Sequence, residues 1–203
     1  LTANCLTFMR VGATNLLIAN PRYFSAFIKE WSKYSVTVFT GVNTLFNALL
    51  NHSQFKTLNF SSLRLTLGGG MAVQKPVAER WKAVTGCDVI QAYGLTETSP
   101  AATINPLGDD LTFNRSIGLP IPSTDVSIRD DLGNELPLNE VGEICVHGPQ
   151  VTAGYWQRPQ DTASIFCADG FLKTGDMGYM DDAGFVYLVD RKKDMILVGG
   201  FNV

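Results

Sequence analysis

Histidine and cysteine are scarce in this chain of 203 residues, which contains two of the first and four of the second. The cysteines form no C-x-x-C pair and lie far apart, at Cys5, Cys87, Cys145 and Cys167. Neither a zinc site nor a disulfide framework is therefore expected, and we interpret these residues as buried thiols in a reducing compartment. His52 and His147 are isolated in the sequence, so we assign neither to catalysis nor to a metal.

Charged residues are also few, at 17% of the chain with a formal net charge of -3. No cluster of Lys and Arg marks a nucleic-acid footprint, so small molecules are the expected partners. Residues 34–54 contain no charged side chain, but asparagine, serine and threonine interrupt them too often for a lipid-facing span. We expect a cytoplasmic protein. Peripheral contact with the inner face of a membrane and the oligomeric state stay open.

Both ends of the chain are abrupt. It begins at Leu1 rather than at a methionine, and Val203 follows closely on a strand-like run at 195–198. No basic segment followed by an apolar run opens the chain, so no signal peptide is expected. The hydrophobic content of 45% suffices for a sizeable core. We therefore expect a globular piece of a longer protein.

Helical and strand periodicities alternate in the first half of the chain. A helix is predicted over 21–33, because apolar residues recur there every three or four positions and Asn20 and Pro21 suit its start. The other elements predicted for this half are strands at 35–39 and 63–67, helices at 42–50 and 73–86, and the end of a strand at 87–90. Such alternation favours a parallel sheet covered by helices.

From about Ser116 the chain changes to short strand candidates separated by turn-forming residues. The candidates lie at 125–129, 142–148 and 185–189. Glycine and proline are dense between Gly118 and Pro122, which suits a junction between two subdomains. The predicted fold class is therefore α/β, a parallel-type sheet with flanking helices followed by a β-rich subdomain.

The segment YGLTET contains several groups that could carry chemistry. Tyr93 offers a flat surface for a base, Thr96 a hydroxyl for a phosphate oxygen, and Glu97 a hard oxygen ligand for Mg²⁺. The segment follows a predicted parallel strand, where open α/β sheets bind ligands. The alternative is a capping threonine and a solvated glutamate.

Three further polar segments are ambiguous when each is taken alone. The glycines at 68–70 would let a ligand approach the backbone, but they lack the spacing of the usual phosphate loops and suit a tight turn. Asp176 could accept two hydrogen bonds from the vicinal hydroxyls of a ribose, although KTGD is typical of a turn. DRKKD, at 190–194, is typical of a solvated connector.

The joint order of the motifs is more specific than any one of them. A glycine loop is followed by YGLTE, SIGLPIP, GEICVHGP, GYW, TGD and DRKKDMI. This order resembles the adenylate-forming superfamily of acyl-CoA synthetases, luciferases and peptide-synthetase adenylation domains, over essentially the whole chain. The stretches GVNTLFNALLN, SIGLPIPST, GPQVTAGYWQRP and DRKKDMILVGGFNV look most like bacterial long-chain fatty acid–CoA ligases.

The resemblance implies a two-step reaction. A fatty carboxylate attacks the α-phosphate of ATP, giving acyl-AMP and pyrophosphate, and the thiol of coenzyme A then displaces AMP. Glu97 would hold Mg²⁺ and Thr96 would contact the phosphate as the two catalytic residues. The implied nucleotide-binding set is Gly68, Gly69, Gly70, Tyr93, Gly94, Thr96, Asp176 and Arg191. In this set Tyr93 stacks on adenine, the three glycines line its edge, and Asp176 binds the ribose with Arg191 nearby on the ribose or phosphate.

The resemblance also implies a division of the chain and a place for the acyl group. Residues 1–115 would form the α/β subdomain and 116–189 a β-rich, distorted-barrel subdomain. Residues 190–203 would start the next domain, with Asp190 as the hinge. Wall candidates for the acyl pocket are Val42, Leu45, Phe46 and Leu49, although ordinary core packing is the alternative for this uncharged helix.

The family's Ser/Thr/Gly-rich phosphate loop and its C-terminal domain with the catalytic lysine are not in the sequence, and Lys192 and Lys193 belong to the hinge segment. We therefore expect the piece alone to be inactive. Three alternatives stay open: an aryl or medium-chain ligase of the same superfamily, a non-catalytic nucleotide-binding or structural fragment, and a dinucleotide-binding oxidoreductase. The last is disfavoured by the missing glycine fingerprint.

Overall fold

The computed structural model describes residues 2–108, 113–191, 197–198 and 201–202. By its internal contacts the chain divides into two compact units. The first comprises Leu1–Ala92 and Pro106–Arg115, and the second comprises Tyr93–Asn105 and Ser116–Val203. Each unit is described below by itself. The three-part domain division expected from the sequence stays a prediction.

A parallel sheet forms the centre of the first unit. Its strands are β1 (Val38–Gly41), β2 (Leu65–Gly68) and β3 (Val89–Tyr93). β1 pairs with β2 and β2 pairs with β3, both in parallel. Parallel neighbours need a crossover connection, and here a helix supplies each one. The predicted strands are present, but β1 starts three residues later than predicted, and β3 continues past residue 90 to Tyr93.

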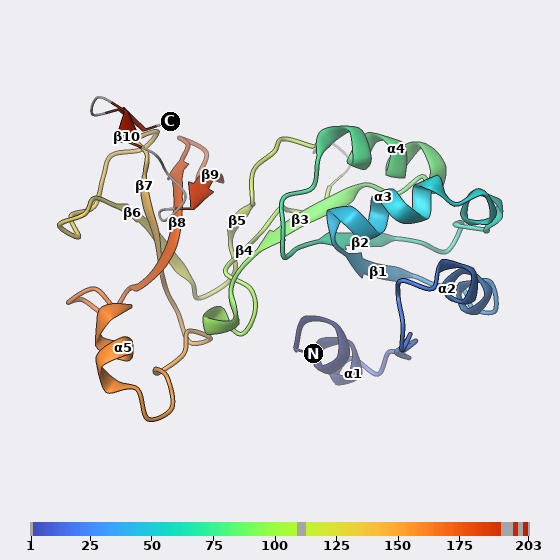
Figure 1. The fold of residues 1–203 in the computed structure, drawn as a ribbon, viewed down its shortest axis with the longest axis horizontal. Helices are drawn as coiled ribbons and strands as arrows, with labels where there is room; N and C mark the ends of the chain where they lie inside the picture. The colour runs from blue at the N-terminus through green and yellow to red at the C-terminus, as the bar shows by residue number, and fades with distance from the viewer. Residues whose placement is uncertain (1, 109–112, 192–196, 199–200, 203) are drawn as a thin grey trace. The chain divides into compact units, whose positions relative to one another are not determined.

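Helices α3 (Asn43–Asn51) and α4 (Lys75–Thr85) are the two crossovers. They lie side by side in Figure 1, and the Arg80 guanidinium joins them by donating to the side-chain oxygens of Asn47 and Asn51 at 3.2 and 2.8 Å. α4 ends at Gly86, whose φ of +74° is the left-handed conformation favoured at a helix C-terminus. Both helices lie where the spacing of apolar residues in the sequence predicts them.

Helix α2 is Phe24–Trp31 rather than 21–33. Asn20 does act as a cap, but for a turn that precedes the helix. Its side-chain oxygen accepts the N–H of Arg22 at 3.1 Å, and its carbonyl accepts the N–H of Tyr23 at 3.2 Å. Asparagine favours such local turns over helix. The remaining short helices of this unit are η1 (Thr2–Leu6), α1 (Thr7–Arg10) and η2 (Ser53–Thr57).

Aromatic rings fill the core of the first unit. Trp81 is fully buried, lies 4.9 Å from the ring of Phe46 and stacks on Phe39 at 5.5 Å. Its indole N–H donates to the hydroxyl of Thr66 at 3.1 Å, which satisfies the polar atom of an otherwise apolar group. Trp31 of α2 packs on Phe39 at 4.9 Å. Within residues 34–54, the apolar Phe46, Leu49 and Leu50 are buried in this core, and the serine, threonine and asparagine residues that interrupt the stretch are exposed or partly exposed.

The second unit is rich in antiparallel strands. Its main sheet has four strands in the order β6 (Asp125–Arg129), β7 (Gly142–His147), β8 (Leu172–Met180) and β9 (Val186–Arg191). Further antiparallel pairs join β4 (Thr103–Ile104) to β5 (Leu119–Pro120), and β10 (Leu197–Val198) to β11 (Phe201–Asn202). The short helices among the described residues of this unit are η3 (Thr96–Thr98) and α5 (Pro159–Ser164).

The fold class is confirmed: α/β with a parallel sheet and helices, followed by a β-rich part. β6 and β7 lie where the sequence predicts them, and β9 begins one residue later than predicted. Of the strand-like run at 195–198, residues 195 and 196 lie outside the described part of the chain. No helix among the described residues is long and apolar enough to cross a membrane.

A buried arginine fixes one end of the main sheet. Arg129 donates to both carboxylate oxygens of Asp169 at 2.9 and 2.7 Å, and its guanidinium lies 4.2 Å from the centre of the Phe171 ring. Planar, bidentate pairing of this kind is the strong form of an ion pair. Its hydrogen bonds raise the pKa of Arg129 and lower the pKa of Asp169. This group ties β6 to the turn that precedes β8.

Candidate functional site

A buried threonine shapes the turn after β3. The hydroxyl of Thr98 accepts the N–H of Leu95 at 2.8 Å and lies within hydrogen-bond distance of the carbonyls of Leu95 and Pro100. A Cβ at Gly94 would collide with the carbonyl of Pro100, so this position requires glycine. Thr98 is therefore the capping threonine that the alternative interpretation of YGLTET expected. Thr96 itself is exposed, and Glu97 is half-buried.

Three of the predicted nucleotide residues meet at one carboxylate. The Tyr93 hydroxyl donates to Oδ2 of Asp176 at 2.7 Å, and Nε of Arg191 lies 3.5 Å from Oδ1. Asp176 is only 6% exposed. Burial, together with the neighbouring Asp176 carboxylate, raises the pKa of Tyr93, so its hydroxyl stays a donor. These residues are far apart in the sequence but contiguous in the folded second unit.

A β-bulge presents Asp176. KTGD lies inside β8, so the interpretation of this segment as a turn is wrong. Gly175 has a φ of +74°, and the pairing with β7 shifts register between Glu143 and Cys145. The carboxylate of Glu143 accepts the N–H of Gly175 at 3.0 Å, and the hydroxyl of Thr174 accepts the N–H of Asp176 at 3.1 Å. Bulges re-aim side chains in this way next to binding sites.

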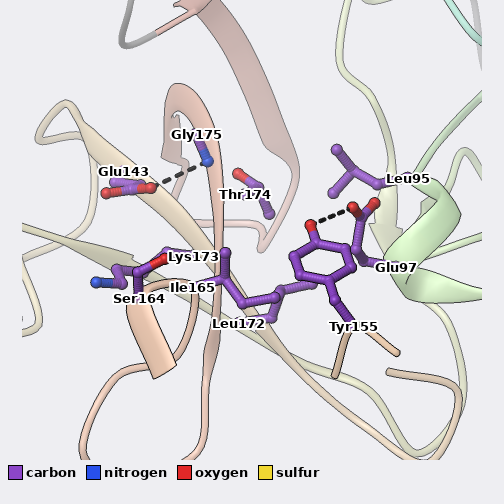
Figure 2. Close-up of a pocket in the computed structure, with 10 residues that line it drawn as sticks. All are labelled: Leu95, Glu97, Glu143, Tyr155, Ser164, Ile165, Leu172, Lys173, Thr174 and Gly175. Atoms are coloured by element: carbon purple, nitrogen blue, oxygen red, sulfur yellow. Dashed lines mark hydrogen bonds between the residues drawn. The ribbon is translucent and has the colours of Figure 1, made fainter. Parts of the chain in front are cut away.

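Glu97 is held by the GPQVTAGYWQRP segment, to which no role in the site was assigned from the sequence. Its Oε1 accepts the hydroxyl of Tyr155 at 2.6 Å, and its backbone carbonyl accepts the N–H of Thr152 at 2.8 Å. The hydrogen bond to Glu97 raises the pKa of Tyr155. Figure 2 shows the hydroxyl and the carboxylate facing each other at the side of a cavity.

Two cavities of the second unit share Glu97 and Tyr155. One, of about 400 Å³, is lined by Leu95, Glu97, Glu143, Tyr155, Ser164, Ile165, Leu172, Lys173, Thr174 and Gly175. The other, of about 470 Å³, is lined by Thr96, Glu97, Ser99, Pro149, Gln150, Val151, Thr152 and Tyr155. The first cavity therefore extends from Glu97 to Gly175, the neighbour of Asp176 in the chain.

The glycines at 68–70 lie in the first unit, at the end of β2. A Cβ on Gly68 would lie 2.5 Å from a methyl of Val73, and Gly70 has a φ of +74°. The N–H of Val73 donates to the side-chain oxygen of Gln91 at 2.9 Å. Close packing and turn geometry thus account for Gly68 and Gly70. Their role toward adenine stays a prediction.

The four acyl-pocket candidates differ in burial. Phe46 and Leu49 are fully buried within the aromatic core, and Leu45 packs against that core from a partly exposed position. Val42 is 37% exposed, and one of its methyls lies 3.7 Å from the position of a Cβ on Gly70. Val42 is therefore the candidate that the described residues leave most open to a ligand. The acyl-pocket assignment stays a prediction.

The hinge candidate is at the end of β9. Asp190 pairs across the sheet with Met177, and its carboxylate accepts the N–H of Arg191 at 2.7 Å. Arg191 in turn pairs with Asp176. Lys192 and Lys193 lie outside the described residues, so the assignment of a hinge at Asp190 stays a prediction.

Known proteins share both the sequence and the fold. A family model described as "AMP-binding enzyme" matches residues 1–156. The chain belongs to the AMP-binding enzyme family. The chain is 57% identical over all 203 residues to a long-chain-fatty-acid–CoA ligase of Yersinia pestis, and it covers 36% of that relative. It thus spans about a third of the length of the curated relatives it matches. The family resemblance stated from the motifs is confirmed.

Two solved structures contain a fold similar to that of this chain. An anthranilate CoA ligase, AuaEII, in complex with anthranoyl-AMP has a TM-score of 0.86 and 29% identity, over 95% of this chain and 37% of that one. O-succinylbenzoate coenzyme A synthetase (MenE) of Bacillus subtilis, in complex with ATP and magnesium ion, has a TM-score of 0.77 and 33% identity, over 89% of this chain and 37% of that one.

Proposed function

We propose that this chain is part of a long-chain fatty acid–CoA ligase, which activates a fatty acid with ATP to acyl-AMP and then transfers the acyl group to coenzyme A. The identity of 57% to such a ligase over the whole chain supports the substrate class. The observation that carries the proposal is the cluster around Asp176, a buried carboxylate whose chain neighbours Thr174 and Gly175 line a cavity that also contains Glu97.

The polar groups of the second unit suit the parts of ATP. Asp176 has two oxygens that can accept the vicinal hydroxyls of a ribose, and Arg191 adds a positive charge beside it. Tyr93 offers its ring to the base while its hydroxyl is engaged with Asp176. Thr96, exposed on the second cavity, can donate to a phosphate oxygen. The assignment of Gly94 and the glycines at 68–70 to the nucleotide rests on the family resemblance.

The residues present fit a magnesium ion that is shared with a substrate. Among the described residues, no group of three or more His, Cys, Asp or Glu side chains is arranged to hold a metal. Mg²⁺ typically binds through one or two carboxylates together with substrate phosphates, and Glu97 supplies one such carboxylate at a cavity. The bound ion would offset negative charge on the phosphates as an anionic nucleophile approaches.

The two half-reactions place different demands on the residues around the nucleotide. A carboxylate that attacks a polyanion needs hydrogen-bond donors and cations around the phosphorus, and Thr96 and Arg191 are candidates for these roles. The thiol of coenzyme A then attacks the acyl carbon, and AMP leaves. Rotation about Asp190 between the two half-reactions is part of the proposal. ATP, a fatty acid and coenzyme A are the proposed partners, in the cytoplasm, with contact to the inner face of a membrane open.

The direct test uses the full-length enzyme that contains this segment. With palmitate, ATP, Mg²⁺ and coenzyme A, we expect equal amounts of palmitoyl-CoA and AMP, quantified by liquid chromatography. The same mixture with the isolated 203-residue chain should give no product. Formation of ADP in place of AMP, or no acyl-CoA from any fatty acid, would rule out the proposed function.

A second candidate, an aryl-CoA ligase, is favoured by one observation: the TM-score of 0.86 with an anthranilate CoA ligase. A panel of benzoate, anthranilate, octanoate and palmitate, ranked by kcat/KM, separates the two functions. We expect palmitate to rank first. An aryl acid at the top of the ranking would replace the fatty-acid assignment.

A further inference from the structure

The loop before α5 is built around Tyr155. Gly154 has a φ of +143°, and a Cβ there would lie 2.5 Å from the methyl of Thr162. The hydroxyl of Thr162 accepts the N–H of Tyr155 at 2.9 Å and donates to the carbonyl of Arg158 at 2.8 Å. The N–H of Arg158 closes the turn on the carbonyl of Tyr155 at 3.2 Å. These contacts anchor the backbone of Tyr155, which precedes α5, to Thr162 in the first turn of that helix.

The same loop fixes Glu97 at two points. The backbone contact runs from Thr152 to the Glu97 carbonyl, and the side-chain contact runs from the Tyr155 hydroxyl to Oε1 at 2.6 Å. A hydroxyl that donates to a carboxylate at this distance forms a charge-assisted hydrogen bond. Among the described residues, no hydrogen bond or ion pair engages Oε2. One carboxylate oxygen is thus held by the protein, and the other is left for a ligand.

Exposure and position argue against a purely structural role for Tyr155. Its side chain lines both cavities, and the residue is 40% exposed, so its hydroxyl is not buried for the sake of packing. The next residue, Trp156, is 88% exposed, so its side chain does not pack the loop against the rest of the unit. The Tyr155 hydroxyl contacts the Glu97 carboxylate (Figure 2), and Glu97 lines both cavities.

We propose that Tyr155 is a positioning residue, whose hydroxyl holds Oε1 of Glu97 so that Oε2 faces the divalent cation that accompanies the nucleotide. This inference rests on the proposed function of the site. Without the hydroxyl, the Glu97 side chain has several rotamers available and must lose that freedom when the cation binds.

The test replaces Tyr155 with phenylalanine in the full-length enzyme and measures cation binding rather than turnover. Mn²⁺ serves as the probe, and its affinity in the presence of ATP and absence of fatty acid is read by electron paramagnetic resonance. A hydrogen bond to a charged acceptor at a partly exposed site predicts Mn²⁺ binding weakened roughly 3- to 10-fold in Tyr155→Phe. Tyr179→Phe is the matched control, because Tyr179 stacks on Tyr187 elsewhere in the sheet.

A double-mutant cycle separates positioning from a general loss of structure. If Tyr155 acts through the carboxylate, Tyr155→Phe has no further effect on Mn²⁺ affinity in a Glu97→Gln background. Unchanged or tighter Mn²⁺ binding in the single variant, or an equal loss in both backgrounds, overturns the proposal. Wild-type palmitoyl-CoA formation is measured alongside. If it occurs, such results refute only the role of Tyr155, whereas a wild-type enzyme without product refutes the proposed function itself.

Discussion

Replacing Asp176 with asparagine should weaken nucleotide binding through the ribose alone. The side chain keeps its shape and one acceptor oxygen, which the Tyr93 hydroxyl already engages. It loses the negative charge beside Arg191 and the second acceptor oxygen. One charge-assisted hydrogen bond to a ribose hydroxyl contributes about 1.5–3 kcal/mol. We therefore expect ATP to bind the full-length variant roughly 10- to 150-fold more weakly.

Isothermal titration of ATP and of 2′,3′-dideoxy-ATP isolates this effect. The wild-type enzyme should bind ATP more tightly than the dideoxy analogue, by roughly the same factor as the loss of ATP affinity in Asp176→Asn. Asp176→Asn should bind both nucleotides about equally and should lose little affinity for the dideoxy analogue. The Arg191 side chain is 59% exposed, so loss of its ion pair should alter stability by less than about 1 kcal/mol. An equal loss for both nucleotides would refute the assignment of Asp176 to the ribose.

Three further predictions concern Glu97, the aromatic core of the first unit and the Arg129–Asp169 ion pair. Glu97→Ala in the full-length enzyme should strongly reduce the rate of acyl-AMP formation, measured as palmitate-dependent pyrophosphate release. An unchanged rate would refute the role of Glu97 as a metal ligand. Phe46→Ala removes a fully buried ring and should lower the free energy of unfolding by about 3–5 kcal/mol in a urea titration, whereas a loss under about 1 kcal/mol would contradict the packing described. Arg129→Met should lower the thermal midpoint without changing ATP affinity. Because Arg129 lowers the folded-state pKa of Asp169, the ion pair stabilises the wild type fully above about pH 4, and this stabilisation should shrink as the pH falls further. A difference in thermal midpoint between wild type and Arg129→Met that does not depend on pH would exclude this ion pair as its source.

Elements with a regular period could be predicted from the sequence. Local apolar spacing and a local stop such as Gly86 define α3, α4, β6 and β7. The residue ranges of these elements could therefore be predicted from the sequence alone. The start of α2 was misplaced because two competing local structures, an Asn20 turn and a helix beginning at Pro21, share the same residues. The hydrogen bonds of Asn20 favour the turn. The spacing of apolar residues carries no information about these hydrogen bonds, so it could not predict them.

Features that depend on distant contacts could not be predicted. KTGD has the composition of a turn, yet pairing with β7 and the Glu143 carboxylate keeps it inside β8 as a bulge. The contact between Tyr155 and Glu97 joins positions 58 residues apart, and GYW gives no local sign of it beyond a glycine before an aromatic residue. The convergence of Tyr93, Asp176 and Arg191 was expected only through the family resemblance.

The fate of the carboxylate oxygens tests the central claim most directly. Palmitate labelled with ¹⁸O in both carboxylate oxygens is supplied to the full-length enzyme with ATP, Mg²⁺ and coenzyme A, and the nucleotide product is analysed by mass spectrometry. Attack of the carboxylate on the α-phosphate predicts AMP that carries one ¹⁸O atom per palmitoyl-CoA formed. Unlabelled AMP, or ADP as the nucleotide product, would contradict activation through acyl-AMP.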